Sequence, residues 1–265
     1  MTVNLNGARV LLTGATGGIG HAIARALHAR GAELVLTGRR TEVLDELAAE
    51  IGGTTIACDL SDPAAISKLM DEVGEIDVLV ANAALPAVGA IADYTEDGID
   101  RDLDVNLRAP IVLTRWATKQ MLPRGRGHIV LIGSLAGRAP SPLTAMYNAT
   151  KFGLRGFALA LREDLAPKGV GVSVILPGFI SDAGMFAESG AKLPPFVGTK
   201  RPDDVARAVV KAIEANRAEL DVAPLPLRAG AHLAALAPGP IGTIQRKLGA
   251  TTTAAQFEKG QADKR

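Results

Sequence analysis

Short apolar runs alternate with segments of helical periodicity along most of the chain. Residues 9–13 and 33–37 are rich in Val and Leu, as expected of strands that are buried on both faces. The segment between them, residues 20–30, places Ile23, Ala26 and Leu27 on one helical face, and Gly31 follows as a C-cap. The pattern therefore begins as strand, helix, strand.

The same alternation continues to residue 223. Further strands are expected at residues 54–57, 78–81, 128–133, 171–176 and 220–223, and further helices at residues 41–50, 63–73, 95–121, 145–165 and 202–216. Strands separated by helices predict right-handed βαβ crossovers. We expect an α/β fold with a single Rossmann-like, doubly wound parallel sheet of about seven strands and helices on both faces.

The composition changes after residue 223. Residues 224–265 are rich in Pro, Gly and Ala and end in the polar run 256–265. We expect residues 1–223 to form one cofactor-binding catalytic domain, and residues 224–265 to form an extension with one or two short helices and a frayed tail.

Charge and cysteine content exclude several classes of protein. The chain has 29 Lys and Arg against 28 Asp and Glu, which gives no field to attract nucleic acid, so no such partner is expected. Cys58 is the only cysteine, which excludes an intrachain disulfide and favours a reducing compartment. The first twenty residues lack a secretory pattern, and the least polar long stretch, residues 229–245, is broken by glycines and prolines. We expect a cytoplasmic protein without an integral membrane segment.

The first strand leads into a glycine-rich turn with the sequence Thr13-Gly14-Ala15-Thr16-Gly17-Gly18-Ile19-Gly20. Glycines here permit a tight turn and close approach of a pyrophosphate, and the following helix offers free N–H groups to the anion. A turn of this kind can be purely structural, but its place after the first strand of a βαβ series favours a dinucleotide site.

The end of the second strand bears on which dinucleotide binds. An acidic side chain would hold the ribose 2′-hydroxyl of NAD(H) there, but the sequence is Thr37-Gly38-Arg39-Arg40. Guanidinium groups match phosphate geometry, so this pair favours NADP(H) over NAD(H), with Arg39 as the first candidate. The alternative is that the two arginines only solvate a loop.

Further motifs follow in a fixed order. They are Asp59-Leu60, Asn82-Ala83-Ala84, Asn106, Ser134 with Tyr147 thirteen residues later and Lys151 four residues after that, and Pro177-Gly178. Together with the glycine-rich turn they resemble the short-chain dehydrogenase/reductase family over about residues 7–223. The resemblance implies four catalytic residues, Asn106, Ser134, Tyr147 and Lys151. It also implies cofactor contacts from Thr13, Gly14, Thr16, Gly18, Ile19, Gly20, Arg39, Arg40, Asp59, Leu60, Asn82, Ala83, Pro177, Gly178 and Ile180.

Two positions depart from the family pattern. Some NADP(H)-dependent members have a basic residue where this chain has Gly17, so Arg39 would act with less help. The family's threonine that binds the nicotinamide carboxamide is replaced by Asp182, which follows Ser181. A carboxylate accepts hydrogen bonds but donates none, so the carboxamide contact is expected to involve Ser181 or to differ in strength.

The residue types suit the interconversion of a secondary alcohol and a ketone. A phenol must ionise more readily than in water to cycle near neutral pH, and Lys151 lies one helical turn from Tyr147, so we expect a lowered pKa for Tyr147. Ser134 can donate to the substrate oxygen as it gains charge. Asn106 is expected to distort its helix and help hold a water near Lys151.

The segment after Pro177-Gly178 forms the substrate lid in this family. Residues 179–186 and 193–197 contain three Phe and one Met in a chain with 3% aromatic residues. An apolar pocket follows, and a hydrophobic or lipid-like ketone or alcohol is the expected substrate. The helices 95–121 and 145–165 pair between subunits in the family, which implies a homodimer or homotetramer. The extension could be a subunit contact, a lid partner or an interfacial helix.

Other chemistries are disfavoured. The four histidines and Cys58 show no metal-ligand spacing, and no serine lies in a Gly-x-Ser-x-Gly context. Two alternatives remain on the same fold: a sensor that binds NADP(H) without turnover, and a dehydratase or epimerase. The first would require loss of the catalytic residues, and the second would require a larger C-terminal domain.

Overall fold

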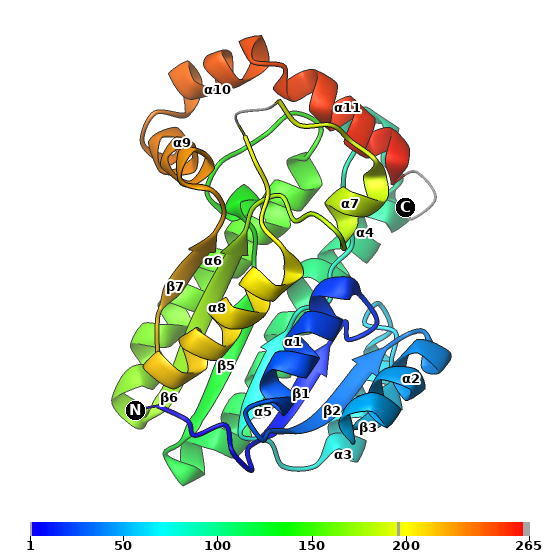
Figure 1. Ribbon diagram of the computed structural model, residues 1–265, viewed down its shortest axis with the longest axis vertical. Helices are drawn as coiled ribbons and strands as arrows, with labels where there is room; N and C mark the ends of the chain where they lie inside the picture. The colour runs from blue at the N-terminus through cyan, green and yellow to red at the C-terminus, as the bar shows by residue number, and fades with distance from the viewer. Residues whose placement is uncertain (1, 195–196, 262–265) are drawn as a thin grey trace.

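The fold is that of a computed structural model, which describes residues 2–194 and 197–261. Seven parallel strands form one sheet in the order β3-β2-β1-β4-β5-β6-β7 (Figure 1). This confirms the expected Rossmann-like doubly wound α/β fold. The strands are β1 (Arg9–Thr13), β2 (Glu33–Gly38), β3 (Thr54–Ala57), β4 (Val78–Ala81), β5 (Gly127–Ile132), β6 (Val170–Pro177) and β7 (Glu219–Val222).

The sheet separates two hydrophobic cores. Side chains alternate across a strand, so Val10 and Leu12 of β1 belong to one core and Leu11 belongs to the other. The first core is covered by α1 (Gly18–His28), α2 (Thr41–Ile51) and α8 (Pro202–Ala215), and the second by α3 (Pro63–Val73), α5 (Ala109–Arg124) and α6 (Ala145–Leu165). The central strands are continuous apolar runs because both of their faces are covered.

The strand order reverses between β1 and β4. The chain moves outward from β1 to β2 and β3, and then returns to place β4 on the other side of β1. The two connections leave a crevice at the carboxyl ends of β1 and β4, which is where open α/β sheets bind ligands. The motifs of the sequence follow strands that end at this edge.

The helix expected at residues 95–121 has three parts. Helix α4 (Glu96–Leu103) begins after Thr95, whose side chain accepts a hydrogen bond from the Gly98 N–H, and it runs into a π-helical turn, η2 (Asp104–Arg108), before α5. Asn106 lies in this turn. The local distortion expected at Asn106 is therefore present, as a widened turn of the kind that often occurs at functional sites.

The C-terminal extension differs from the expectation of one or two helices and a frayed tail. It contains three helices, α9 (Leu225–Leu236), α10 (Pro238–Lys247) and α11 (Ala250–Gly260). The polar run is anchored because the Lys192 N–H donates to Gln256 Oε1 at 3.0 Å and Gln261 Nε2 donates to the Met185 carbonyl at 2.8 Å. Residues 262–265 of the expected tail lie outside the described residues.

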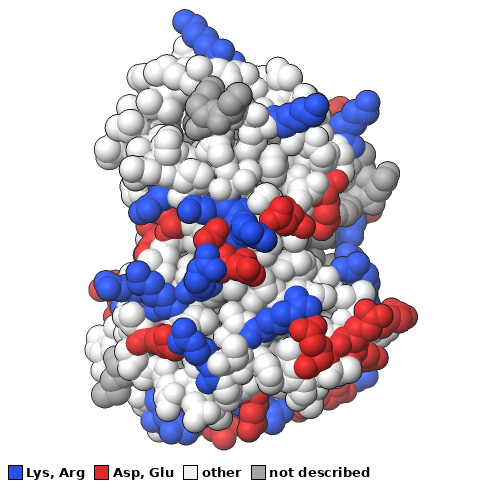
Figure 2. Space-filling view, in the orientation of Figure 1, with Lys and Arg blue, Asp and Glu red and all other residues white. Residues whose placement is uncertain are grey.

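The three C-terminal helices form an arch above the carboxyl edge of the sheet (Figure 1). The arch starts at the end of β7 and ends against α7 (Met185–Ser189). Figure 2 shows that this upper part of the molecule is mostly uncharged, whereas acidic and basic groups are mixed over the lower part.

Candidate active site

The glycine-rich turn and the loop after β4 are tied together at the crevice. Thr13 Oγ1 accepts hydrogen bonds from the backbone N–H groups of Asn82 and Ala83 at 3.0 and 3.1 Å. In return, Asn82 Nδ2 donates to the carbonyls of Thr13 and Gly14, both at 3.1 Å. Gly14 has φ of 65°, and a Cβ on it would lie 2.7 Å from Ala83 Cα, so a larger residue would force the two loops apart. Thr13 and Asn82 thus hold the glycine-rich turn and the loop after β4 at a fixed separation.

The N-terminus of α1 faces this crevice. The helix begins at Gly18, and its N-cap residue Gly17 provides no capping side chain. The first N–H groups of the helix have no intrahelical acceptor, so they are available to an anion such as a pyrophosphate. A Cβ on Gly20 would lie 2.2 Å from the Gly14 carbonyl oxygen, so only glycine allows the helix to pack this closely on the turn. The cradle fits a dinucleotide.

The two arginines after β2 have different partners. Arg40 donates from Nη2 to the Thr16 carbonyl at 2.5 Å and so connects the end of β2 with the glycine-rich turn. Arg39 is exposed and lies near the Asp59 carboxylate. Burial alone would raise the pKa of Asp59, but hydrogen bonds from the N–H and hydroxyl of Ser61 outweigh it, and together with Arg39 they leave this pKa below its ordinary value.

The segment after β3 includes two more of the expected cofactor contacts. Asp59 and the buried Leu60 follow directly on Cys58, which is itself buried. Burial raises the pKa of the Cys58 thiol to about 11, so this cysteine stays protonated at neutral pH and is a poor nucleophile.

Ser134, Tyr147 and Lys151 are brought together next to the crevice. Ser134 follows β5 and its Oγ accepts the Ala136 N–H at 3.1 Å, which caps a 3₁₀ turn, η3 (Leu135–Gly137). The Ser134 hydroxyl also hydrogen-bonds with the Tyr147 phenol. Lys151 Nζ lies 5.6 Å from the centre of the Tyr147 ring.

Lys151 is the largest fully buried side chain of the described residues, with 2% of its surface exposed. Its Nζ donates to the Ile132 carbonyl at 3.0 Å, at the end of β5. Burial lowers the pKa of Lys151 to about 8, because an ammonium loses its hydration in this setting. A buried lysine that is held by one carbonyl is costly for stability, which is a mark of a functional group.

The pKa of Tyr147 departs from the sequence-based expectation. Burial raises it above the ordinary value of 10.0, and the hydrogen bond with Ser134 lowers it only in part. The expectation that Lys151 lowers the pKa of Tyr147 is therefore wrong for the chain by itself. The Lys151 ammonium points to the Ile132 carbonyl, and Tyr147 and Lys151 are both buried away from water.

The Asn106 side chain forms two hydrogen bonds with the backbone of Leu85. Its Oδ1 accepts the Leu85 N–H at 2.6 Å and its Nδ2 donates to the Leu85 carbonyl at 3.0 Å. Asn106 is 1% exposed, so this side chain fixes the loop after β4 through one N–H and one lone pair of its amide.

The segment after β6 closes the crevice from above. Buried Ile180 forms an isolated parallel bridge with Lys200, and a Cβ on Gly178 would lie 2.9 Å from Ala223 Cβ. Pro177 accepts a hydrogen bond from Ser134 Oγ at 3.4 Å through its carbonyl. This segment therefore contacts both Ser134 and the C-terminal part of the chain.

Asp182 and Ser181 are directed away from the crevice. Asp182 has φ of 68°, and its carboxylate lies 3.3 Å from Arg201 Nε. The Ser181 hydroxyl donates to the Lys200 carbonyl at 3.3 Å. As placed, neither side chain replaces the family's threonine, so a carboxamide contact from either of them would require this segment to rearrange.

The apolar residues of the lid pack partly on each other. Phe179 and Phe186 have ring centres 5.0 Å apart, and Met185 begins α7. The lid residue Phe196 lies outside the described residues.

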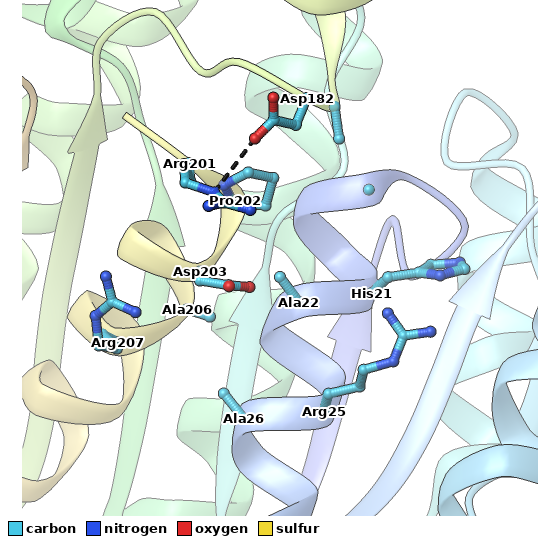
Figure 3. A pocket seen from close by; sticks show the side chains of 12 residues that line it. His21, Ala22, Arg25, Ala26, Asp182, Arg201, Pro202, Asp203, Ala206 and Arg207 are labelled. Carbon is cyan, nitrogen blue, oxygen red and sulfur yellow. Dashed lines mark ion pairs between the residues drawn. The ribbon is translucent and has the colours of Figure 1, made fainter. Parts of the chain in front are cut away.

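A groove of about 590 Å³ runs between α1 and α8, beside the lid segment. Figure 3 shows Asp182 paired with Arg201 at its edge and His21 and Arg25 on α1. None of the four candidate catalytic residues lines this groove. The groove lies beside the glycine-rich turn and the lid segment, and the candidate active site is the one around Tyr147.

A buried ionic cluster next to the site was not foreseen. Arg138 follows the turn that Ser134 caps and is 3% exposed. It pairs with Asp221 at 3.1 Å and with Glu219, both on β7, and it also contacts His232 of α9. The signal in the sequence was the pair of acidic residues in the short strand Glu219–Val222, which are unusual for a buried sheet.

The fold and the site define an oxidoreductase with a Rossmann-like dinucleotide crevice. The family model described as short chain dehydrogenase matches residues 8–194. The chain belongs to the short-chain dehydrogenase/reductase family, as its motifs indicated.

Three similar proteins illustrate the range of that family. The ketoacyl reductase HetN of Nostoc sp. (strain PCC 7120) is 38% identical over 227 residues, which is 82% of this chain and 79% of HetN. A short-chain dehydrogenase from Sphingobium yanoikuyae in complex with NADPH is 29% identical, with a TM-score of 0.75 over 90% of this chain and 95% of that one. A 3-ketoacyl-(acyl-carrier-protein) reductase from Brucella melitensis complexed with NADH is 26% identical, with a TM-score of 0.74 over 82% and 97%.

Proposed function

We propose that this chain interconverts a hydrophobic ketone and its secondary alcohol with NADP(H), and that Tyr147 is the general acid and base. The observation that carries the proposal is the grouping of Ser134, Tyr147 and Lys151 beside the crevice, with Lys151 Nζ 5.6 Å from the Tyr147 ring. The division into a catalytic domain, residues 1–223, and an extension, residues 224–265, is part of the same proposal.

In the reductive direction the bound cofactor supplies a hydride to the carbonyl carbon. Tyr147 then gives its phenolic proton to the carbonyl oxygen, and its raised pKa keeps that proton in place until it is needed. The Ser134 hydroxyl, already within reach of the phenol, donates to the same oxygen as negative charge develops on it. Lys151, with a pKa of about 8, is poised to return a proton to Tyr147 at neutral pH.

The preference for NADP(H) rests on the end of β2. No carboxylate is available at positions 37–40 for a ribose 2′-hydroxyl, whereas Arg39 and Arg40 are both exposed there. Because Arg40 is already bonded to the Thr16 carbonyl, Arg39 is the freer of the two to bind a 2′-phosphate. Several similar structures contain NADPH or NADP and another contains NADH, so these residues and not the fold alone must decide which cofactor binds.

The substrate class follows from the lid. Phe179, Met185 and Phe186 belong to the segment that follows β6, and HetN is named a ketoacyl reductase. A 3-oxoacyl group joined to a carrier, or another ketone with a long apolar part, fits this setting.

A panel of substrates tests the proposal. Short polar aldehydes, 3-oxoacyl thioesters of increasing length and cyclic ketones would be compared at the nicotinamide absorbance, with NADPH and NADH. We expect kcat/KM to rise with apolar length and to be higher with NADPH. Faster turnover of the short polar substrates, or no turnover of any ketone, would contradict it.

We also propose a homodimer or homotetramer formed through α6. The outer face of this helix has Phe152 and the small residues Gly153, Gly156 and Ala160, all exposed in the single chain. Helices with small residues on one face approach closely, which suits pairing between two copies. Sedimentation equilibrium of the purified chain tests this, and a monomer at micromolar concentration would contradict it.

A further inference from the structure

The outer face of α9 is apolar. Leu225, Leu233 and Leu236 are 74%, 54% and 84% exposed, whereas Ala231 and Ala234 are buried. At 100° per residue the three leucines fall within one quarter of the helix surface, opposite the two alanines. Leucines on the solvent side and alanines on the protein side reverse the usual pattern of a surface helix.

Helix α10, which packs against α9, and the residue after it add two more exposed apolar side chains. Ile244 and Leu248 are about half exposed and lie one helical turn apart. We call these five side chains, Leu225, Leu233, Leu236, Ile244 and Leu248, the arch patch. The three other exposed large apolar side chains of the described residues, Ile91, Leu122 and Phe152, belong to other elements, and two of them are less exposed than any member of the arch patch. The exposed apolar surface is therefore concentrated in the arch, which marks an interaction site.

Helices α9 and α10 have basic side chains but no acidic ones. The sequence has no Asp or Glu between Asp221 and Glu258, although the chain as a whole has a charge of only +1. The same stretch contains Arg228, Arg246 and Lys247, and all three are exposed. Arg228 Nε lies 3.8 Å from the Asp221 carboxylate, so the charge available to a partner comes chiefly from Arg246 and Lys247. In Figure 2 basic groups lie at the top and at the right side of the mostly uncharged region, and an acidic group shows beside those on the right.

We propose that the arch patch docks on an anionic lipid surface, with α9 and α10 lying in the headgroup region. Apolar side chains flanked by cations, without acidic groups, fit a surface of negatively charged lipids. No helix among the described residues could cross a membrane, so the contact is with one leaflet. A second copy of this chain suits the patch less, because a two-fold contact would bring its cations together with no acidic group on α9 or α10 to offset them.

The position of the arch next to the lid connects the proposed membrane contact with substrate entry. Helix α11 continues from α10 and ends against the lid, where Gln261 Nε2 donates to the Met185 carbonyl. A docked arch would place the lid near the membrane surface, so that a lipid-like substrate could enter without crossing water. This use rests on the proposed function, whereas docking itself does not.

Binding to vesicles tests the docking. The purified full chain would be sedimented with vesicles of phosphatidylcholine alone and of phosphatidylcholine with 30% phosphatidylglycerol, at low and high salt. We expect wild type to prefer the anionic vesicles by about tenfold at low salt, with the preference lost at high salt. The variant Arg246→Gln/Lys247→Gln should lose most of that preference.

The apolar part is tested by Leu236→Gln/Ile244→Gln/Leu248→Gln, which should bind anionic vesicles at least about tenfold more weakly. A matched control, Ile91→Gln/Leu122→Gln, changes exposed apolar residues outside the arch and should bind as wild type does. Circular dichroism and NADPH binding show that each variant is folded. Wild type that stays in the supernatant with anionic vesicles overturns the proposal. A triple variant that binds vesicles normally but has a smaller mass in sedimentation also overturns it, since the patch would then be a subunit contact. All of these readouts are independent of turnover.

Discussion

At the scale of single residues, the buried ammonium of Lys151 lowers the free energy of unfolding. The unfolded chain holds this proton up to about pH 10.5 and the folded chain releases it near pH 8, so the free energy of unfolding rises with pH between these values. Below pH 8 the buried ammonium opposes folding by up to about 3 kcal/mol. The protein keeps a destabilising residue next to Tyr147, as expected of a catalytic group.

Lys151→Met tests this cost. Methionine fills a similar volume without a charge, although it leaves the Ile132 carbonyl without its hydrogen bond. We expect the midpoint of thermal unfolding at pH 7 to be unchanged or higher, while ketone reduction is lost and NADPH binding is weaker. Calorimetry and turnover measure the two effects. A midpoint several degrees lower would mean that Lys151 stabilises the fold.

The proposed choice of cofactor also depends on one residue, Arg39. Arg39→Asp should lower the affinity for NADPH at least about tenfold, because a charge-assisted contact to phosphate is replaced by repulsion, and it should raise the relative affinity for NADH. Fluorescence titration with both cofactors measures this. Arg126→Asp is a matched control at the opposite end of the sheet, before His128, and should change neither affinity. Equal affinities of wild type for the two cofactors would contradict the proposed preference.

At the scale of elements, the π-helical turn joins Asn106 to the loop after β4. Asn106→Ala removes both hydrogen bonds with Leu85 and leaves a buried N–H and a buried carbonyl unpaired. We expect a loss of about 2–4 kcal/mol in the free energy of unfolding and weaker NADPH binding, because the loop also holds Thr13. Urea unfolding measures the first effect. A variant with wild-type stability would show that the turn does not depend on this side chain.

The elements themselves were largely predictable. Each strand is a short apolar run because both faces of the sheet are covered, so the strand positions followed from the pattern with differences of one or two residues. The arch was not predictable in detail. Its helices are held by contacts between distant residues, such as Gln261 with Met185, that no local pattern encodes.

The candidate site was predictable in part for the same reason. Ser134 and Tyr147 meet because the carboxyl end of β5 and the start of α6 are fixed by the fold. The orientations of Asp182 and Lys151 depend on single partners, Arg201 and the Ile132 carbonyl, and sequence spacing does not determine such contacts.

At the scale of the whole molecule, stability should fall in acid because of a buried histidine in β5. Burial lowers the pKa of His128 to about 3, while the unfolded chain takes up this proton near pH 6.5. The stabilisation is complete above pH 6.5 and is lost as the pH falls toward 3, and the part lost by pH 4.5 amounts to about 2.5–3 kcal/mol. Its Nε2 lies 2.8 Å from Ser173 Oγ, so glutamine can replace that contact without titrating.

Urea unfolding of wild type and His128→Gln at pH 7 and pH 4.5 measures this. The variant should lose about 2.5–3 kcal/mol less than wild type over this range. An identical loss in both proteins would show that other groups cause the acid sensitivity.

The central claim is that Tyr147 delivers the proton during reduction of a ketone. Tyr147→Phe keeps the ring and its packing, so the variant should fold and bind NADPH as wild type does. The direct measurement is a single-turnover reaction of the NADPH-loaded enzyme with its best ketone, followed at the nicotinamide absorbance. We expect the rate of the chemical step to fall at least about 10²-fold, the usual contribution of a positioned general acid. A near-normal rate in this variant would show that the proton comes from another group, and it would contradict the mechanism proposed for this site.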